Sequence, residues 1–120
     1  MKILIAENEP MVQKILSTYL KQAGFDIVTA NNGKSAIQLF KTENPDLVVT
    51  GLMMPAANGT EVISYIRHTA KRSTPIVVIS NIGLQASITN TLSLGADAYI
   101  LKPLQLKEVL AKIHQLLYRQ

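Results

Sequence analysis

The sequence contains no cysteine among its 120 residues. This absence excludes a disulfide framework, thiol catalysis and thiolate metal sites, and it agrees with a reducing compartment, so we expect a cytoplasmic protein. Long apolar runs are missing as well. Because no stretch of eighteen apolar residues occurs, we expect no membrane span, and the apolar "ILIA" near the start meets the charged "ENEP" too early for a secretory signal.

Low-complexity segments, linkers and solenoid repeats are also absent, and no GxGxxG or Walker sequence for binding phosphate appears. What is present is enough apolar material for a core, since 48% of the residues are hydrophobic. We therefore predict a single domain that spans residues 1–120.

Basic residues exceed acidic residues only slightly, which gives a net charge of +4. The densest basic run is "RHTAKR" at residues 67–72, and no aromatic residue interleaves with it, as a binder of single-stranded nucleic acid would require. We interpret the basic surface as a means of keeping the domain soluble, and we do not expect direct binding of nucleic acid. An affinity that falls steeply with salt would argue for the opposite reading.

Five short apolar runs predict strands that are buried on both faces. They are rich in Val and Ile and do not alternate with polar residues, which is typical of a parallel sheet. The second run has the most polar flanks and is expected at an edge. The runs cover residues 3–6, 27–30, 47–50, 76–79 and 98–101.

Helical patterns lie between these runs. Apolar residues spaced at i, i+3, i+4, i+7 and i+8 form a single stripe over residues 12–20, and a similar stripe covers residues 106–117. Shorter patterns occur near residues 37–40 and 62–66, and the weakest, around residues 84–92, is rich in Ser, Thr and Asn. Asn32-Gly33 and Asn58 are expected to begin helices, while Gly24 and Gly95 suit the left-handed position after a helix end.

Five strands that alternate with five helices predict an α/β domain with a doubly wound parallel sheet. Functional sites in such sheets form at the carboxyl ends of the strands, near the point where the strand order reverses. In this sequence those ends are "AENEP", "TGLMMP", "SNIG" and "LKP".

Four stretches in register carry a family resemblance: "KILIAENEP", "PDLVVTGLMMPAANG", "TPIVVISN" and "GADAYILKP". In them the chain resembles the receiver domain of bacterial response regulators, and the resemblance covers essentially the whole sequence. It implies a flavodoxin-like (βα)5 fold with strand order 2-1-3-4-5. It also implies a role in two-component or phosphorelay signal transduction rather than an enzyme activity.

Receiver domains accept a phosphoryl group from a histidine kinase on an aspartate at the end of the third strand, with help from Mg²⁺. A carboxylate must attack phosphorus, and a hard cation must offset the charge on both groups. By the resemblance, the acidic pair of this pocket falls on Glu7 and Asn8, and the acceptor falls on Gly51. The backbone carbonyl that binds Mg²⁺ in the family belongs here to Met53. The hydroxyl and the lysine are those of Ser80 and Lys102.

The resemblance also assigns a switch, formed by Ser80 and Tyr99, and a Lys102–Pro103 peptide bond that is commonly cis in the family. The switch reports phosphorylation in an active receiver. Here the acceptor position offers nothing to phosphorylate, because Gly51 has no side chain.

Neighbouring residues are not expected to replace the missing aspartate. Asp46 begins the same strand and lies about 16 Å away, and Thr50 points to the opposite face. Of the three acidic positions only Glu7 keeps its charge, so we expect Mg²⁺ binding to be lost or very weak. The sequence thus indicates a degenerate pocket, with no catalytic residue, no metal site and no cofactor.

Lys102 then needs another partner, since an unpaired, partly buried ammonium is costly. We predict an ion pair between Glu7 and Lys102 across the vacant pocket, with Asn8 and Ser80 forming hydrogen bonds nearby. Glu9 is expected to face solvent at the start of the first helix, where its charge suits the helix dipole.

The interpretation that follows is a pseudo-receiver that acts by protein–protein contact. By the resemblance its partner is a histidine kinase, or an output protein or domain, bound through the fourth helix, fifth strand and fifth helix. A weak homodimer is a further alternative. The main alternative is a regulatory domain cut from a longer DNA-binding transcriptional regulator. An engineered Asp→Gly change at Gly51 is a further alternative, whereas phosphoryl transfer at another residue disagrees with the pocket.

Overall fold

The computed structural model describes residues 1–118. Residues 119 and 120, the end of the predicted domain, lie outside the described residues. The strands are β1 (Lys2–Ala6), β2 (Asp26–Ala30), β3 (Leu47–Gly51), β4 (Ile76–Ser80) and β5 (Ala98–Leu101). The helices are α1 (Pro10–Gln22), α2 (Gly33–Glu43), α3 (Gly59–Ser64), the π-helical turn η1 (Tyr65–Thr69), α4 (Gln85–Ser93) and α5 (Leu106–Tyr118). The five predicted strands are confirmed, each to within one residue at either end.

The strands form one parallel sheet in the order β2-β1-β3-β4-β5, which confirms the predicted order 2-1-3-4-5. β2 lies at an edge, as its polar flanks predicted, while every residue of β3 and β4 is buried. The chain leaves β1 for β2 and returns to the other side of β1 as β3. The strand order therefore reverses between β1 and β3, where the carboxyl ends of these strands open a site.

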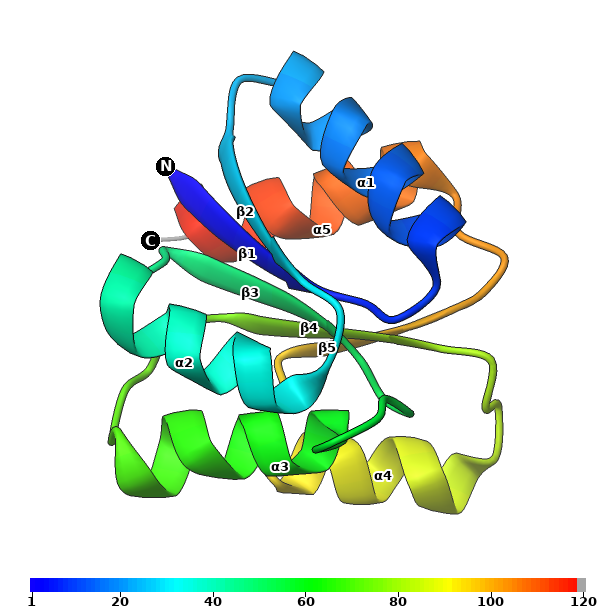
Figure 1. The fold of residues 1–120 in the computed structure, drawn as a ribbon. Helices are drawn as coiled ribbons and strands as arrows, with labels where there is room; N and C mark the ends of the chain where they lie inside the picture. Colours follow the sequence, from blue (N-terminus) through cyan, green and yellow to red (C-terminus); the bar gives the residue numbers. More distant parts are fainter. Residues whose placement is uncertain (119–120) are drawn as a thin grey trace.

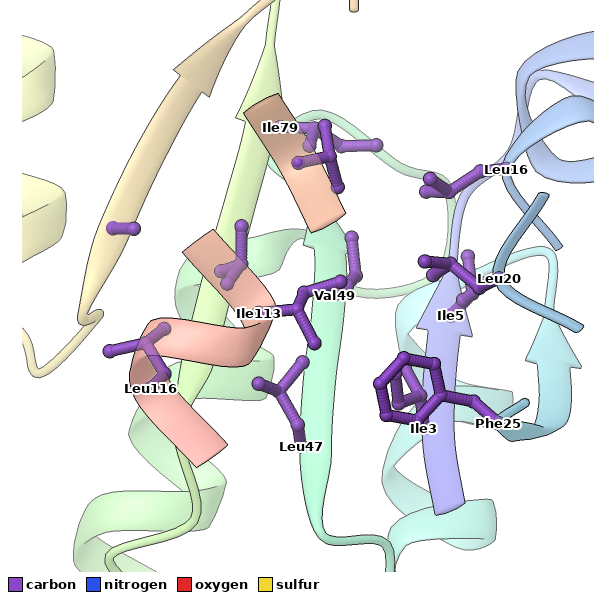
Figure 2. Close-up of a cluster of buried hydrophobic side chains, with 13 residues drawn as sticks. Ile3, Ile5, Leu16, Leu20, Phe25, Leu47, Val49, Ile79, Ile113 and Leu116 are labelled. Carbon is purple, nitrogen blue, oxygen red and sulfur yellow. The ribbon is translucent and has the colours of Figure 1, made fainter. Parts of the chain in front are cut away.

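Helices cover both faces of the sheet (Figure 1). α1 and α5 lie on one face, and α2, α3 and α4 lie on the other. Figure 2 shows the first of the two apolar cores, in which Ile3 and Ile5 of β1 and Leu47 and Val49 of β3 point toward side chains of α1 and α5. The second core fills the space on the opposite face, under α2, α3 and η1. Burial on both faces explains why the strands read as continuous apolar runs.

The predicted helix boundaries are set by local hydrogen bonds. The Asn32 side chain accepts a hydrogen bond from Ser35 N (2.8 Å) at the start of α2, and that of Asn58 accepts one from Glu61 N (3.1 Å) at the start of α3. Gly24 and Gly95 have φ angles of +102° and +125°, so both adopt the left-handed conformation that ends a helix. None of the helices within residues 1–118 has the length and apolar character needed to cross a bilayer.

Candidate functional site

The carboxyl edge of the sheet brings the predicted pocket residues together. A cavity of about 70 Å³ opens there. We call it the Gly51 pocket. Among the residues that line it are Glu7, Glu9, Gly51, Met53, Ser80 and Lys102. Glu7 follows β1, Gly51 ends β3, Ser80 ends β4 and Lys102 follows β5, so four parallel strands each supply one member.

Gly51 lines this pocket without any steric need for a glycine. A Cβ atom at this position would lie 3.4 Å from Glu7 Oε1 and 3.5 Å from Met54 Cγ, which are ordinary contact distances. Gly59 differs, because its Cβ would collide with the carbonyl oxygen of Gly51. The β3 backbone therefore tolerates a side chain at Gly51, and what the glycine removes from the pocket is a chemical group.

The buried carboxylate of Glu7 forms the predicted ion pair with Lys102. Glu7 Oε2 lies 3.0 Å from Lys102 Nζ, and the two side chains are 1% and 12% exposed. This confirms the expected partner of the lysine. Burial of both groups makes the pair interdependent, because removing either one leaves a charge in a poorly solvated place.

Glu9 faces solvent at the start of α1, as expected, and is in addition a second partner of Lys102. Its side chain is 51% exposed, yet Glu9 Oε1 lies 2.7 Å from Lys102 Nζ. The contact with Lys102 was not predicted, because only the helix dipole was considered for this carboxylate. Glu9 and Lys102 are 93 positions apart, so no local sequence signal could have linked them.

These contacts set the charge state of the lysine. Burial of the ammonium works against its charge, but hydrogen bonds from Lys102 to Glu9 and Glu7, together with the negative charges of both carboxylates, outweigh burial. They raise the pKa of Lys102 above its ordinary value of 10.5. The pocket thus holds a charged lysine between two carboxylates at neutral pH.

The other carboxylate oxygen of Glu7, Oε1, accepts hydrogen bonds from Glu9 and Asn8. Glu9 N donates to Glu7 Oε1 (3.2 Å). With its amide nitrogen turned toward acceptors, Asn8 donates from Nδ2 to Glu7 Oε1 (3.0 Å) and to Met53 O (3.2 Å). The Asn8 amide therefore joins the β1–α1 and β3–α3 loops, as a neutral bridge between a carboxylate and a backbone carbonyl.

Ser80 and Tyr99 both bind the backbone of Ile82. Ser80 lines the pocket beside the ion pair and forms a hydrogen bond there, as expected; its Oγ accepts from Ile82 N (3.0 Å). Tyr99 is partly buried, and its hydroxyl donates to Ile82 O (2.7 Å). The loop between β4 and α4 is thereby held at the same residue from the pocket side and from β5.

Two further residues occupy the positions that the sequence predicted. Asp46 lies at the other end of the sheet, where its Oδ2 accepts a hydrogen bond from Lys2 N (2.8 Å). Thr50 is fully buried, and its hydroxyl donates to Gly51 O (2.9 Å). Beside the pocket, the Lys102–Pro103 peptide bond is cis.

Comparison with known proteins agrees with this fold. Residues 3–114 match the family model described as the response regulator receiver domain. The chain is 39% identical over 118 residues to a probable transcriptional regulator, ycf27 of Guillardia theta. The match covers 98% of this chain and 46% of that protein. It is 36% identical to the transcriptional regulatory protein ResD of Bacillus subtilis, again over 98% of this chain and 48% of the relative.

A solved structure is similar over the same extent. The receiver domain of the Francisella response regulator 1452 superposes with a TM-score of 0.93 at 27% identity, over 98% of this chain and 97% of that one. The chain spans about half the length of the curated relatives that it matches.

Proposed function

Because the chain belongs to the response regulator receiver domain family, we propose that it is a pseudo-receiver that signals by protein–protein contact without phosphorylation. It is then a signalling module and not an enzyme. One observation carries this proposal: the Gly51 pocket has no side chain at the acceptor position, and its two loops and its lysine are bound to one another by Glu7 and Asn8. A pocket whose loops are already joined by these contacts requires no phosphoryl group to hold them in place.

The donor set does not fit Mg²⁺. The ammonium of Lys102 lies 3.0 Å from the one buried carboxylate, and an amide nitrogen, which cannot ligate a cation, lies on Met53 O. Among the described residues, no group of three or more His, Cys, Asp or Glu side chains is placed to hold a metal ion. We therefore propose that Mg²⁺ binding is lost or very weak, and no step of the function uses the metal.

The partner surface that we propose is the face of α4, β5 and α5. Leu92 on α4 and Leu101 on β5 are exposed there, and Leu101 lies beside Gly83 at the approach to α4. Tyr99, in the same strand as Leu101, joins this face to the β4–α4 loop. A histidine kinase or an output protein or domain would bind a surface of fixed shape, since no phosphorylation shifts it.

A second candidate function is favoured by the comparisons. Relatives such as ycf27 and ResD are named as transcriptional regulators, and this chain matches about half of each. The chain would then be the regulatory half of a longer DNA-binding regulator. Reading the gene beyond the codon for residue 120 decides between the two.

Backbone amide NMR spectra test the pseudo-receiver. We expect the signals of Ser80, Ile82 and Tyr99 to stay unchanged when Mg²⁺ and acetyl phosphate are added together. An Asn8→Asp, Gly51→Asp double variant, which regains the acceptor and a second acid, serves as the responsive control. Shifts in the native spectrum that match those of the double variant would contradict the proposal.

A further inference from the structure

A second cavity lies next to the Gly51 pocket. Its volume is about 410 Å³, and it lies between α1 and the segment that leads from β5 into α5. We call it the α1–α5 groove. Glu9, Asn81 and Lys102 line both the groove and the Gly51 pocket, so these side chains stand between the two spaces.

The walls of the groove are apolar. Leu16 is buried beneath it, while Ile15 is 49% exposed. A volume of several hundred Å³ with apolar walls and a few polar groups is typical of a small-molecule site. The apolar residues that line it are Val12, Ile15, Leu16, Pro103, Leu104 and Leu106.

Charge distinguishes the polar end of the groove. Glu9 and Lys102 line this end, and Glu7, which lies behind them in the Gly51 pocket, also pairs with the ammonium of Lys102; the three groups together carry one negative charge in excess. Glu7 is buried and already accepts hydrogen bonds on Oε1, whereas Glu9 is half-exposed at the boundary with the groove. Lys14, the next basic residue along α1, lines a neighbouring hollow and not the groove. The exposed carboxylate of Glu9 thus favours a cation at this end.

We propose that the α1–α5 groove binds a small amphipathic cation, with its apolar body on Ile15 and Leu104 and its ammonium on the Glu9 carboxylate. The groove contacts α1 from Val12 to Leu16, which is one turn or about 6 Å of helix. A docked helix would need an apolar stripe several turns long. A small molecule is the occupant that this length fits.

Occupancy of the groove acts on the pocket through Glu9. A ligand ammonium on this carboxylate competes with Lys102, which then depends on Glu7 alone. Binding of a ligand in the groove does not depend on the proposed function. The further step, that the ligand controls signalling in place of phosphorylation, does rest on that function.

The test uses three probes that share one body: 4-phenylbutylamine, 4-phenylbutanol and 4-phenylbutyrate. Each is titrated into the full chain and followed by amide NMR, with affinity from calorimetry. We expect the amine to bind most tightly and the carboxylate most weakly, with shifts at Ile15 and Leu104. Glu9→Gln should lower the affinity for the amine about tenfold, which is the cost of one charge-assisted hydrogen bond. The affinity for the alcohol should stay unchanged.

Matched variants separate the parts of the site. Ile15→Ser should weaken all three probes, since Ile15 forms the exposed wall. Glu108→Gln alters an exposed glutamate of α5 that does not line the groove, and it should change none of them. Retained amide dispersion in each variant establishes that it is folded.

Several results would overturn the proposal: equal or tighter binding of the carboxylate, an amine affinity that Glu9→Gln leaves unchanged, or no saturable binding of any probe. Shifts at Ile15 and Leu104 that follow protein concentration alone would assign the groove to a second copy of the chain and would equally overturn it. No phosphodonor is present in these titrations. The binding result is thus independent of phosphorylation. If the native chain were found to be phosphorylated in a separate experiment, the proposed function would be wrong, but the evidence for this binding site would be unaffected.

Discussion

Lys102 Nζ lies 3.0 Å from Glu7 Oε2 and 2.7 Å from Glu9 Oε1, so a single ammonium joins the end of β5 to the β1–α1 loop. The pair with Glu7 is buried, while the pair with Glu9 is open to water. Their contributions to stability therefore differ, since solvent screens exposed pairs strongly and buried pairs weakly.

Replacing the lysine should destabilise the domain. Lys102→Met leaves Glu7 charged and buried, and we expect the free energy of unfolding to fall by about 3 kcal/mol. Urea denaturation followed by circular dichroism measures the change. Lys107→Met, at an exposed position of α5, is the matched control and should stay within about 0.5 kcal/mol of the native chain. Equal losses in both variants would show that the ion pair contributes nothing.

The stability that Lys102 supplies should vanish at alkaline pH. Because folding raises the pKa of Lys102, its contribution is complete below the ordinary value of 10.5 and is lost as the pH rises through the higher value of the folded state. The difference in unfolding free energy between the native chain and Lys102→Met should therefore be constant from neutral pH to about pH 10 and shrink above it. Denaturation series at several pH values check this. A difference that grew above pH 10 would refute the assignment.

Gly51 and its neighbour in space, Gly59, should respond oppositely to substitution by alanine. Gly51→Ala meets only ordinary contacts, so a gain of about 0.5 kcal/mol from reduced unfolded-state entropy is expected. Gly59→Ala brings a Cβ against the carbonyl of Gly51 and should destabilise the domain by about 2 kcal/mol or more. Thermal unfolding of both variants gives the comparison. Similar losses in the two would mean that the backbone at Gly51 requires a glycine.

Tyr99 should hold the β4–α4 loop through its hydroxyl. Tyr99→Phe removes the hydrogen bond to Ile82 O and should cost about 1 kcal/mol, with faster amide hydrogen exchange at residues 81–84. Tyr118→Phe is the control, because Tyr118 is an exposed residue at the end of α5. Unchanged exchange in Tyr99→Phe would indicate that Ser80 alone fixes the loop.

Much of the fold could be predicted from local pattern. Strands buried on both faces appear as continuous Val- and Ile-rich runs, and Asn32, Asn58, Gly24 and Gly95 mark helix ends by local chemistry. The order of the strands came from the family resemblance, since periodicity does not encode which strands pair. The π-helical turn after α3 carried no sequence signal, because its hydrogen bond from Ala70 N to Tyr65 O depends on how the backbone packs.

The pocket was predictable only in part. The positions of Glu7 and Lys102, and the need to pair a partly buried ammonium, indicated their contact. The hydrogen bond of Asn8 beside the ion pair was predicted, whereas its bond to Met53 O and the contact of Glu9 with Lys102 were not, because both depend on loop geometry that brings together residues distant in sequence. Ser80 was expected to form a hydrogen bond beside the ion pair, but its partner, the backbone amide two residues ahead, could not be predicted.

Intact-mass spectrometry after incubation with Mg²⁺ and acetyl phosphate tests the central claim most directly. The native chain is measured beside the Asn8→Asp, Gly51→Asp double variant, which has a nucleophile and two acids in the pocket. We expect the native chain to keep its mass while the double variant gains one phosphoryl group. A native chain that gains a phosphoryl group would contradict the pseudo-receiver, and the modified residue would show where the chemistry takes place.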